Sequence, residues 1–361
     1  MQRARRRLGV FQIEASTYSP LESAIHPRSA FPEEWEFRKM SPATFEKIAV
    51  HFPLVQRVTF SGWGDPLENE KIIPMLDLAR EAGCLTGMTT CCLGMEEGFS
   101  DRLIESELDF LVISLDLEKA LGQSLARGGD AAPILEAAAD LARRKKERRR
   151  GKPSLKLSFP MTRLNLRELP DIVPIAAEAG ADGVVFRNLD YLPGERWNIL
   201  RAFHHESPTP AFQETVGEIL KAGEKAKIYV EVAPLKAEEI PVCEADPPNR
   251  IFFSADGSVA PCPYLCLPKK GNIPRIFLNR GAQVPRVTFG NVNDEDFADI
   301  WAKTEYVDFR TIFAERKAAA REHAARMLDP ASQAGSTPAA GSHEAPPLPE
   351  VCRTCYKAYG I

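Results

Sequence analysis

Short apolar runs alternate with amphipathic stretches along the first half of the chain. The runs hold four to six residues and are rich in β-branched and aromatic side chains, as is typical of strands buried on both faces. They lie at residues 10–15, 58–61, 85–90, 110–115, 155–159 and 184–187. Between them, apolar residues recur at helical spacing over residues 72–82, 134–148 and 169–179. The pattern therefore predicts six consecutive βα units.

Six such units predict an α/β fold with a parallel sheet and right-handed crossovers. Because a closed TIM barrel needs eight strands, we expect an open, partial (β/α)6 TIM-like barrel over residues 1–195. Binding and catalytic residues of such folds lie beyond the carboxyl ends of the strands. Residues 196–240 are predicted to bridge to a small cysteine-rich α+β module at 241–361. The bridge contains a helical pattern at 212–222 and a short strand near 228–232.

Composition narrows the class of protein. The 361 residues carry 46 Lys and Arg against 50 Asp and Glu, and 44% of them are hydrophobic, as in an ordinary globular protein. This balance gives no reason to expect nucleic-acid binding, and no apolar run is long enough to predict a membrane span. The basic start lacks the apolar stretch of a secretory signal, so a cytoplasmic location is expected.

Two segments are predicted to lie outside the packed core. The basic run at residues 143–150 is interpreted as the solvated end of a helix, where cations are favourable. Residues 329–350, rich in Pro, Ala, Ser and Gly, are interpreted as a flexible linker.

Five of the eight cysteines lie in the last third of the chain. In a reducing compartment, clustered cysteines more often bind a metal than form disulfides. Cys243 and Cys262 flank a predicted hairpin with an Asp-Gly turn, and Cys352 and Cys355 form a Cys-x2-Cys pair. We predict that these four thiolates form one site, whose donors suit an iron–sulfur cluster or structural zinc. Cys266 is a further candidate ligand.

Several segments resemble radical S-adenosylmethionine (SAM) enzymes with a C-terminal SPASM or twitch-type auxiliary-cluster module, and together they cover nearly the whole chain. The segment Ser61-Gly-Trp-Gly-Asp-Pro-Leu67 is similar to the family's Gly-Gly-Glu-Pro segment, whose backbone meets the amino group of SAM. Ser114-Leu-Asp116 is similar to a Ser-x-Asp segment near the SAM ribose. The resemblance implies SAM contacts at Gly62, Trp63, Gly64, Asp65, Ser114 and Asp116.

The C-terminal resemblance rests on Gly257-x4-Cys262, on residues 289–292 and 300–301, and on the closing cysteines. It implies one auxiliary 4Fe–4S cluster on Cys243, Cys262, Cys352 and Cys355. It also implies a peptide or protein as substrate or partner.

The motif that defines the family is altered. Radical SAM enzymes bind their catalytic cluster through Cys-x3-Cys-x2-Cys, and the same spacing here holds Ser19, Ser23 and His26. A serine hydroxyl is neither soft nor easily deprotonated, so it holds iron poorly, although a histidine ligates iron in Rieske centres. Cys91 and Cys92 follow the third predicted strand. They form a relocated site with His26 or, on the simpler interpretation, are small buried hydrophobes.

Three hypotheses follow. The leading one is a degenerate radical SAM-like binding or accessory protein, with one C-terminal cluster, weakened SAM binding and no radical chemistry. The alternative is an active oxidoreductase, or a maturase for peptides or proteins, with an atypical N-terminal site. A third is a redox-inert zinc protein. Glu14 and Asp116, expected at the mouth of the barrel, are either an acid–base or metal pair or remnants of SAM hydrogen bonding.

Overall fold

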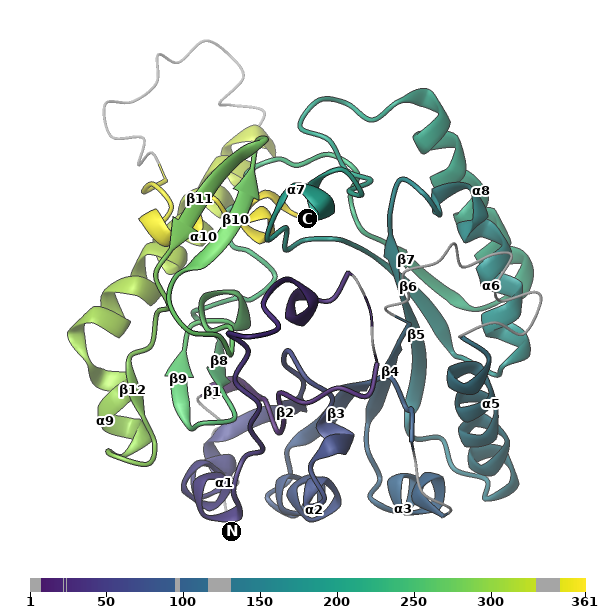
Figure 1. Cartoon of the computed structure of the whole chain (residues 1–361), viewed down its shortest axis with the longest axis horizontal. Coiled ribbons are helices and arrows are strands. Elements are labelled where there is room, and N and C mark those ends of the chain that lie inside the picture. Colours follow the sequence, from purple (N-terminus) through teal and green to yellow (C-terminus); the bar gives the residue numbers. More distant parts are fainter. Residues whose placement is uncertain (1–7, 22, 24, 95–97, 116–130, 329–344) are drawn as a thin grey trace.

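The computed structural model describes residues 8–21, 23, 25–94, 98–115, 131–328 and 345–361 (Figure 1). Within them lies one ten-stranded sheet, in the order β12-β9-β8-β1-β2-β3-β4-β5-β6-β7. All neighbours from β8 to β7 are parallel. The first seven strands are β1 (Leu8–Ile13), β2 (Val55–Phe60), β3 (Leu85–Thr90), β4 (Phe110–Ser114), β5 (Ser154–Met161), β6 (Gly183–Asn188) and β7 (Tyr229–Val232).

The predicted α/β partial barrel is confirmed. The six expected strands are β1 to β6, with ends that differ from the predicted bounds by up to three residues. The strand expected near 228–232 is β7, which pairs with β6 and continues the same sheet. The arc of strands curves around an interior that the amino-terminal loops enter, as Figure 1 shows.

Helices cover the convex face of the arc (Figure 1). They are α1 (Pro42–Ala49), α2 (Ile72–Glu81), α3 (Phe99–Glu105), α5 (Ala132–Glu147), α6 (Leu169–Glu178) and α8 (Pro210–Ala226); the short α7 (Glu195–Asn198) follows β6. Their ends have local causes. At α1, for example, the Ser41 side chain accepts from the Thr44 N–H and Pro42 occupies the first turn, where a missing N–H costs nothing.

Side chains alternate between the two faces of each strand, and the faces differ in polarity. Phe11 and Ile13 of β1 are fully buried in the core shared with the helices. Between them, Gln12 faces the concave side, where its side-chain amide donates to the Ser61 hydroxyl at 3.1 Å. On the far side of the arc, Arg187 of β6 likewise faces the interior. The concave face is therefore polar at its carboxyl end.

The last third of the chain joins the barrel at β1. The predicted Asp-Gly hairpin is confirmed as β8 (Arg250–Phe253) and β9 (Ser258–Ala260), with Gly257 at φ +85° in the turn. β8 pairs in parallel with β1. Then follow β10 (Ile273–Phe277), β11 (Arg280–Val284), β12 (Gly290–Asn291), α9 (Phe297–Ala302) and α10 (Thr304–Leu328). The apolar periodicity did not indicate α10.

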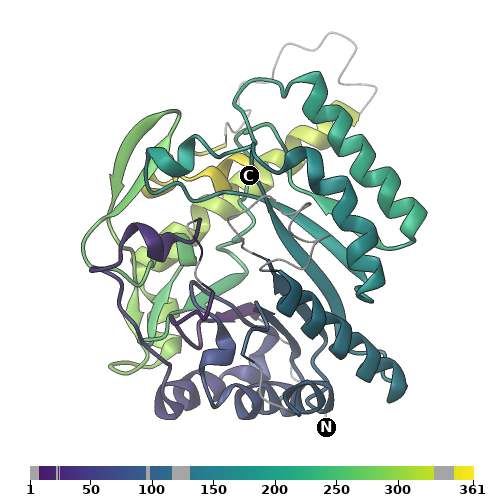
Figure 2. The ribbon, with the colours of Figure 1, turned by 45° about the vertical axis from the view of Figure 1, so that its right-hand side comes forward.

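The C-terminal residues (yellow in Figures 1 and 2) return between α10 and the barrel. The backbone N–H groups of Glu238 and Ile240 donate to the carbonyls of Tyr359 and Ala358 at 2.9 and 3.0 Å. Arg316 of α10 donates to the carbonyl of Pro346 at 2.6 Å. These bonds fix the closing Cys-x2-Cys pair against the bridge that leaves β7. Most of the predicted linker, 329–344, lies outside the described residues.

The basic run at 143–150 is a helix end, as predicted. Arg144 pairs with Asp101 at 2.8 Å and Arg143 with Glu147 at 2.7 Å. Because these cations have carboxylate partners on α3 and α5, the run is a neutralised helix surface. Among the described residues, no helix is long and apolar enough to cross a membrane.

Gly87 of β3 lies directly beneath the ring of Phe110 on β4, and an added Cβ would overlap that ring. We expect Gly87→Ala to lower the free energy of unfolding by about 1–3 kcal/mol through overpacking. Gly217→Ala is the matched control, because no atom lies near its Cβ position in α8. It should raise that free energy by about 0.5–1 kcal/mol through helix propensity. Urea denaturation measures both, and equal effects would refute the packing argument.

Candidate functional site

A pocket of about 270 Å³ opens at the carboxyl ends of the strands, between the barrel and the C-terminal third of the chain. Its walls come from β1, the loops after β2 and β6, the start of β8 and the last residues of the chain. Polar and charged residues dominate one part of the lining: Gln12, His26, Arg187, Asp190, Glu244, Arg250 and Lys357. Trp63, Tyr191 and Tyr264 form an aromatic wall.

Of the three candidate ligand positions in the N-terminal loop, His26 lines this pocket, whereas Ser19 and Ser23 do not. Ser19 and Ser23 turn their hydroxyls to their own loop, accepting from the N–H groups of Leu21 and Ile25 at 3.2 and 3.3 Å. Such turns are the usual local use of a serine side chain. The two hydroxyls therefore stabilise the loop that carries them.

Both ring nitrogens of His26 take part in hydrogen bonds. The backbone N–H of Arg28 donates to Nδ1 at 3.1 Å, so Nδ1 carries no proton. Nε2 lies 2.7 Å from the carbonyl oxygen of Trp63 and is therefore the protonated donor. A neutral imidazole in this tautomer has no lone pair left for a metal. Two such hydroxyls and this imidazole do not fit the catalytic 4Fe–4S cluster of radical SAM enzymes.

The relocated site proposed for Cys91 and Cys92 is not formed with His26. Both cysteines are buried in the main core, and neither lines the pocket. Burial strongly raises the pKa of both thiols, with the neighbouring Asp65 carboxylate as the next cause. They behave as small buried hydrophobes.

The segment at 61–65 packs tightly against the end of β1. A Cβ on Gly64 would overlap the backbone of residues 16–18, and one on Gly62 would overlap the side chain of Glu14. Glycine is thus needed at both positions for close backbone approach. The Trp63 N–H donates to Glu14 Oε1 at 2.8 Å, and its carbonyl accepts from His26. The protein's own side chains therefore already bind the backbone that the resemblance assigns to SAM.

Asp65 is 5% exposed and faces the sheet rather than the pocket. Its carboxylate accepts from the N–H groups of Leu67 and Cys91 at 2.9 and 2.7 Å and from the Thr90 hydroxyl. It thus joins the loops after β2 and β3. Ser114, at the end of β4, accepts from Arg187 Nη2 at 2.9 Å. Asp116 lies outside the described residues.

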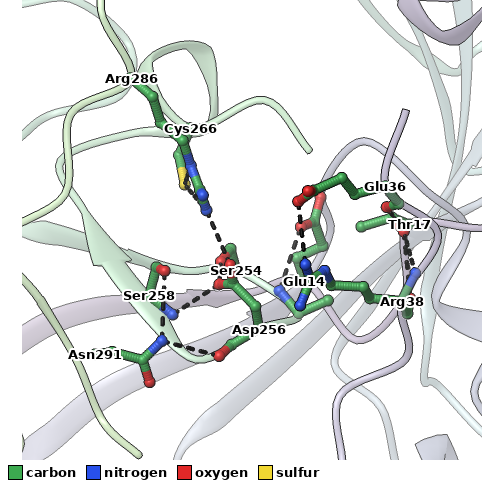
Figure 3. Close-up of polar contacts among 11 residues, drawn as sticks. Glu14, Thr17, Glu36, Arg38, Ser254, Asp256, Ser258, Cys266, Arg286 and Asn291 are labelled. Atoms are coloured by element: carbon green, nitrogen blue, oxygen red, sulfur yellow. Dashed lines mark hydrogen bonds and ion pairs between the residues drawn. The ribbon is translucent and has the colours of Figure 1, made fainter. Parts of the chain in front are cut away.

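Glu14, at the end of β1, bridges the barrel and the β8–β9 hairpin. Oε1 accepts from Trp63 and Oε2 accepts from the N–H of Ala255 at 3.3 Å. Burial raises the pKa of Glu14 to about 7, although both hydrogen bonds oppose the shift. The neighbouring charges are Asp256 and Arg286 (Figure 3). Glu14 therefore forms a structural bridge, whereas its expected pairing with Asp116 stays a prediction because Asp116 lies outside the described residues.

The four cysteines predicted as ligands converge. Cys243, Cys262, Cys352 and Cys355 line one small apolar pocket between the β8–β9 hairpin, α10 and the C-terminal turns. Burial, followed by the other thiols of the group, raises the pKa of Cys243 to about 11 and that of Cys262 further. A bound metal would have to displace these protons, and its positive charge would then offset the mutual repulsion of the thiolates. Among the described residues, no three His, Cys, Asp or Glu side chains are arranged as a site for a single metal ion.

Cys266 does not join this group. It is fully buried beside Phe252 and Ala260, and Arg286 donates to its sulfur through Nε and Nη2 at 3.4 and 3.3 Å. Figure 3 shows Arg286 between this sulfur and the Asp256 carboxylate. Burial raises the pKa of the Cys266 thiol to about 11 against the effect of Arg286. We therefore interpret Cys266 as a structural thiol.

The two pockets share a wall. Ala245, Tyr264 and Lys357 line both the polar pocket and the cysteine pocket. Lys357 Nζ pairs with Asp190 and with Glu244 at 2.8 Å each. Sequence reasoning did not single out Lys357 or Glu244, although each lies within two residues of a predicted cysteine ligand.

Residues 243–326 match the family model of the SPASM iron–sulfur cluster-binding domain. Cys243 and Cys262 lie inside that segment, and Cys352 and Cys355 follow it. A curated relative is the tungsten-containing aldehyde ferredoxin oxidoreductase cofactor-modifying protein of Pyrococcus furiosus. It is 25% identical over 288 residues, which are 78% of each chain.

Solved structures share the fold. Streptococcus suis SuiB bound to S-adenosylmethionine aligns with a TM-score of 0.59 and 15% identity, over 84% of this chain and 68% of SuiB. anSMEcpe with bound AdoMet aligns with a TM-score of 0.58 and 14% identity, over 84% of each chain. The resemblance to radical SAM proteins with a SPASM domain is thereby confirmed, and the SPASM match favours iron–sulfur binding at the cysteine site. The comparisons favour a modifying protein over the accessory protein that the sequence led us to expect.

Glu14 predicts a pH-dependent stability. Its pKa rises from 4.5 to about 7 on folding, so folding favours the protonated form. This contribution is complete below pH 4.5 and is lost as the pH rises through 7. The loss amounts to about 3 kcal/mol at 1.36 kcal/mol per unit. At low pH, Glu14→Gln should have a lower free energy of unfolding than the unaltered protein, because an amide NH2 group cannot accept from the N–H of Trp63 or Ala255. The variant should also lack the fall in this free energy as the pH rises. Urea denaturation from pH 4.5 to 8 tests it; parallel curves would contradict it.

The cysteine assignment predicts a contrast between two single substitutions. Cys352→Ser should lose most bound iron and the brown absorbance, and its thermal unfolding midpoint should fall, because a ligand is lost. Cys266→Ser should keep its iron, since that sulfur bonds only to Arg286 among the described residues. Iron analysis and visible spectra of anaerobically purified proteins measure this. Iron loss in both variants would make Cys266 a ligand.

Proposed function

We propose that this protein is a maturase-type modifying protein, which binds its substrate in the polar pocket between the partial barrel and the SPASM domain. The observation that carries the proposal is the shared wall of Ala245, Tyr264 and Lys357. A molecule bound among the polar side chains would lie one side chain away from the cysteine site. In open α/β sheets, the same crevice at the carboxyl ends of the strands is the usual place for ligands.

The cysteine site is proposed to hold one 4Fe–4S cluster on Cys243, Cys262, Cys352 and Cys355. Four soft thiolates in a largely apolar pocket suit such a cluster. When bound, the cluster would supply a one-electron redox centre beside the pocket. Tyr264 separates the two sites, and its hydroxyl donates to Asp190 at 2.7 Å, so its ring is held in place.

Known relatives support a modification reaction. The Pyrococcus furiosus relative is named as a cofactor-modifying protein. SuiB has been solved bound to its precursor peptide SuiA, and anSMEcpe with AdoMet and the Cp18Cys peptide. For this chain we therefore propose a peptide, a protein segment or a cofactor as substrate. We also propose SAM contacts at Gly62, Trp63 and Ser114. The backbone carbonyl of Trp63 can contact SAM only after its hydrogen bond with His26 breaks.

One observation favours a second candidate, an accessory protein that binds substrate for a separate enzyme. Ser19, Ser23 and His26 offer no thiolate, and all three have hydrogen bonds within the protein. Without an iron–sulfur cluster at that loop, the chain's own residues hold a substrate but do not reduce SAM.

Iron, sulfide and zinc analysis of anaerobically purified protein separates the candidates, together with an assay for 5′-deoxyadenosine formed from SAM under reducing conditions. A modifying role that cleaves SAM requires 5′-deoxyadenosine and more iron than the C-terminal cluster holds, because the four thiolates proposed for that cluster leave no iron free to bind SAM. About four irons per chain without 5′-deoxyadenosine would contradict the modifying role and favour the accessory role. Zinc without sulfide would refute both.

Restoring thiolates gives a further control. The triple variant Ser19→Cys, Ser23→Cys, His26→Cys should gain iron and sulfide if the loop keeps the geometry of the family. A variant that folds with unchanged iron would show that the loop no longer forms a cluster site.

A further inference from the structure

The concave face of the barrel carries two arginines that come from opposite sides of the sheet. Arg187 lies on β6, and Arg250 is the first residue of β8, which joins the sheet at β1. In β8, Ile251 and Phe253 face the main core, so Arg250 faces the barrel interior by alternation. Both side chains line the polar pocket.

Neutral side chains contact both guanidinium groups. Arg187 donates to the hydroxyls of Ser114 and Ser158, on the neighbouring strands β4 and β5. Arg250 Nη1 lies 3.4 Å from the side-chain carbonyl of Gln12, a long hydrogen bond. Its Nε is buried without a hydrogen-bond partner. Within the described ranges, no carboxylate lies within ion-pair distance of Arg250.

The third cation of the pocket is already neutralised. Lys357 pairs with both Asp190 and Glu244, with its Nζ 2.8 Å from a carboxylate oxygen of each. Arg187, Arg250 and Lys357 line the same pocket, so the three cations share one electrostatic neighbourhood. Because Lys357 pairs with both carboxylates of the described lining, Asp190 and Glu244, neither of them neutralises Arg250.

We propose that this pocket is an anion subsite, in which Arg250 and Arg187 bind a carboxylate or phosphate group of the substrate. The inference rests on the proposed function only in calling the ligand a substrate. A guanidinium with an unused N–H donates strongly to such oxygens, in a fork that matches their geometry. Breaking one long bond to Gln12 costs little, so Arg250 is the residue available to a ligand.

The size and walls of the pocket define the rest of the ligand. A volume of about 270 Å³ is at the lower end for small-molecule sites, so it holds a small organic anion or one acidic side chain of a peptide. The rings of Trp63, Tyr191 and Tyr264 add an aromatic wall to the same pocket. The occupant is thus an acid with a compact apolar or aromatic body.

Titration of inorganic phosphate into the anaerobically purified full-length protein tests the subsite at constant ionic strength. Calorimetry reports binding without a reductant or SAM cleavage, so its failure is separate from that of the proposed function. Arg250→Gln should weaken phosphate binding at least tenfold. Arg280→Gln, the same change at an exposed position of β11, should leave it unchanged. No binding to the unaltered protein, or equal loss in both variants, overturns the proposal.

Two further measurements test the subsite if the variant does not fold and identify the source of the anion. If Arg250→Gln fails to fold, phenylglyoxal labelling of the unaltered protein replaces it: phosphate should protect Arg250 and leave Arg280 reactive, and equal labelling overturns the proposal. Competition with S-adenosylhomocysteine distinguishes the source of the anion. Phosphate binding to the S-adenosylhomocysteine complex supports a substrate acid. Mutual exclusion would assign the arginines to the SAM carboxylate and overturn the substrate class.

Discussion

The parallel pairing of β8 with β1 is the contact on which the rest of this molecule depends. Residues 10–13 lie beside residues 250–253, so the start and the last third of the chain share one sheet. Through this contact, the β8–β9 hairpin brings Cys262 close to the barrel and places Arg250 on its concave face. Glu14, one residue beyond β1, adds a second connection by accepting from both Trp63 and Ala255. The polar pocket and the cysteine site are neighbours because of these bonds.

The N-terminal loop shows that this fold forms without three thiolates at the mouth of the barrel. The spacing of Ser19, Ser23 and His26 matches a three-thiolate site, yet each side chain now stabilises protein structure. The His26 ring donates to the Trp63 carbonyl, so this carbonyl already has a hydrogen-bond partner within the chain. Fold-level likeness therefore supports a binding site at this mouth, while the chemistry has to be argued from the residues present.

Much of the fold could be predicted from local patterns. The strands were recognisable because both of their faces are buried. The convergence of four cysteines was predictable because a hairpin and a Cys-x2-Cys pair each impose a narrow range of geometries. The separation of Cys266 from Cys262 was not predictable, since it depends on Arg286 approaching the sulfur from a different segment. Arg250 was missed for a similar reason: its place beside Gln12 follows from a pairing across more than 200 residues, which no local pattern records.

The same long-range pairing constrains the order in which the chain matures on the ribosome. β1 is made first, and β2 can pair with one of its edges early, but the other edge has to wait for residues 250–253. Until then, a strand of mostly apolar residues presents unpaired backbone groups, which are a template for aggregation. A nascent chain of this protein is thus most vulnerable during synthesis of its middle third, when chaperone protection of the β1 edge would matter most.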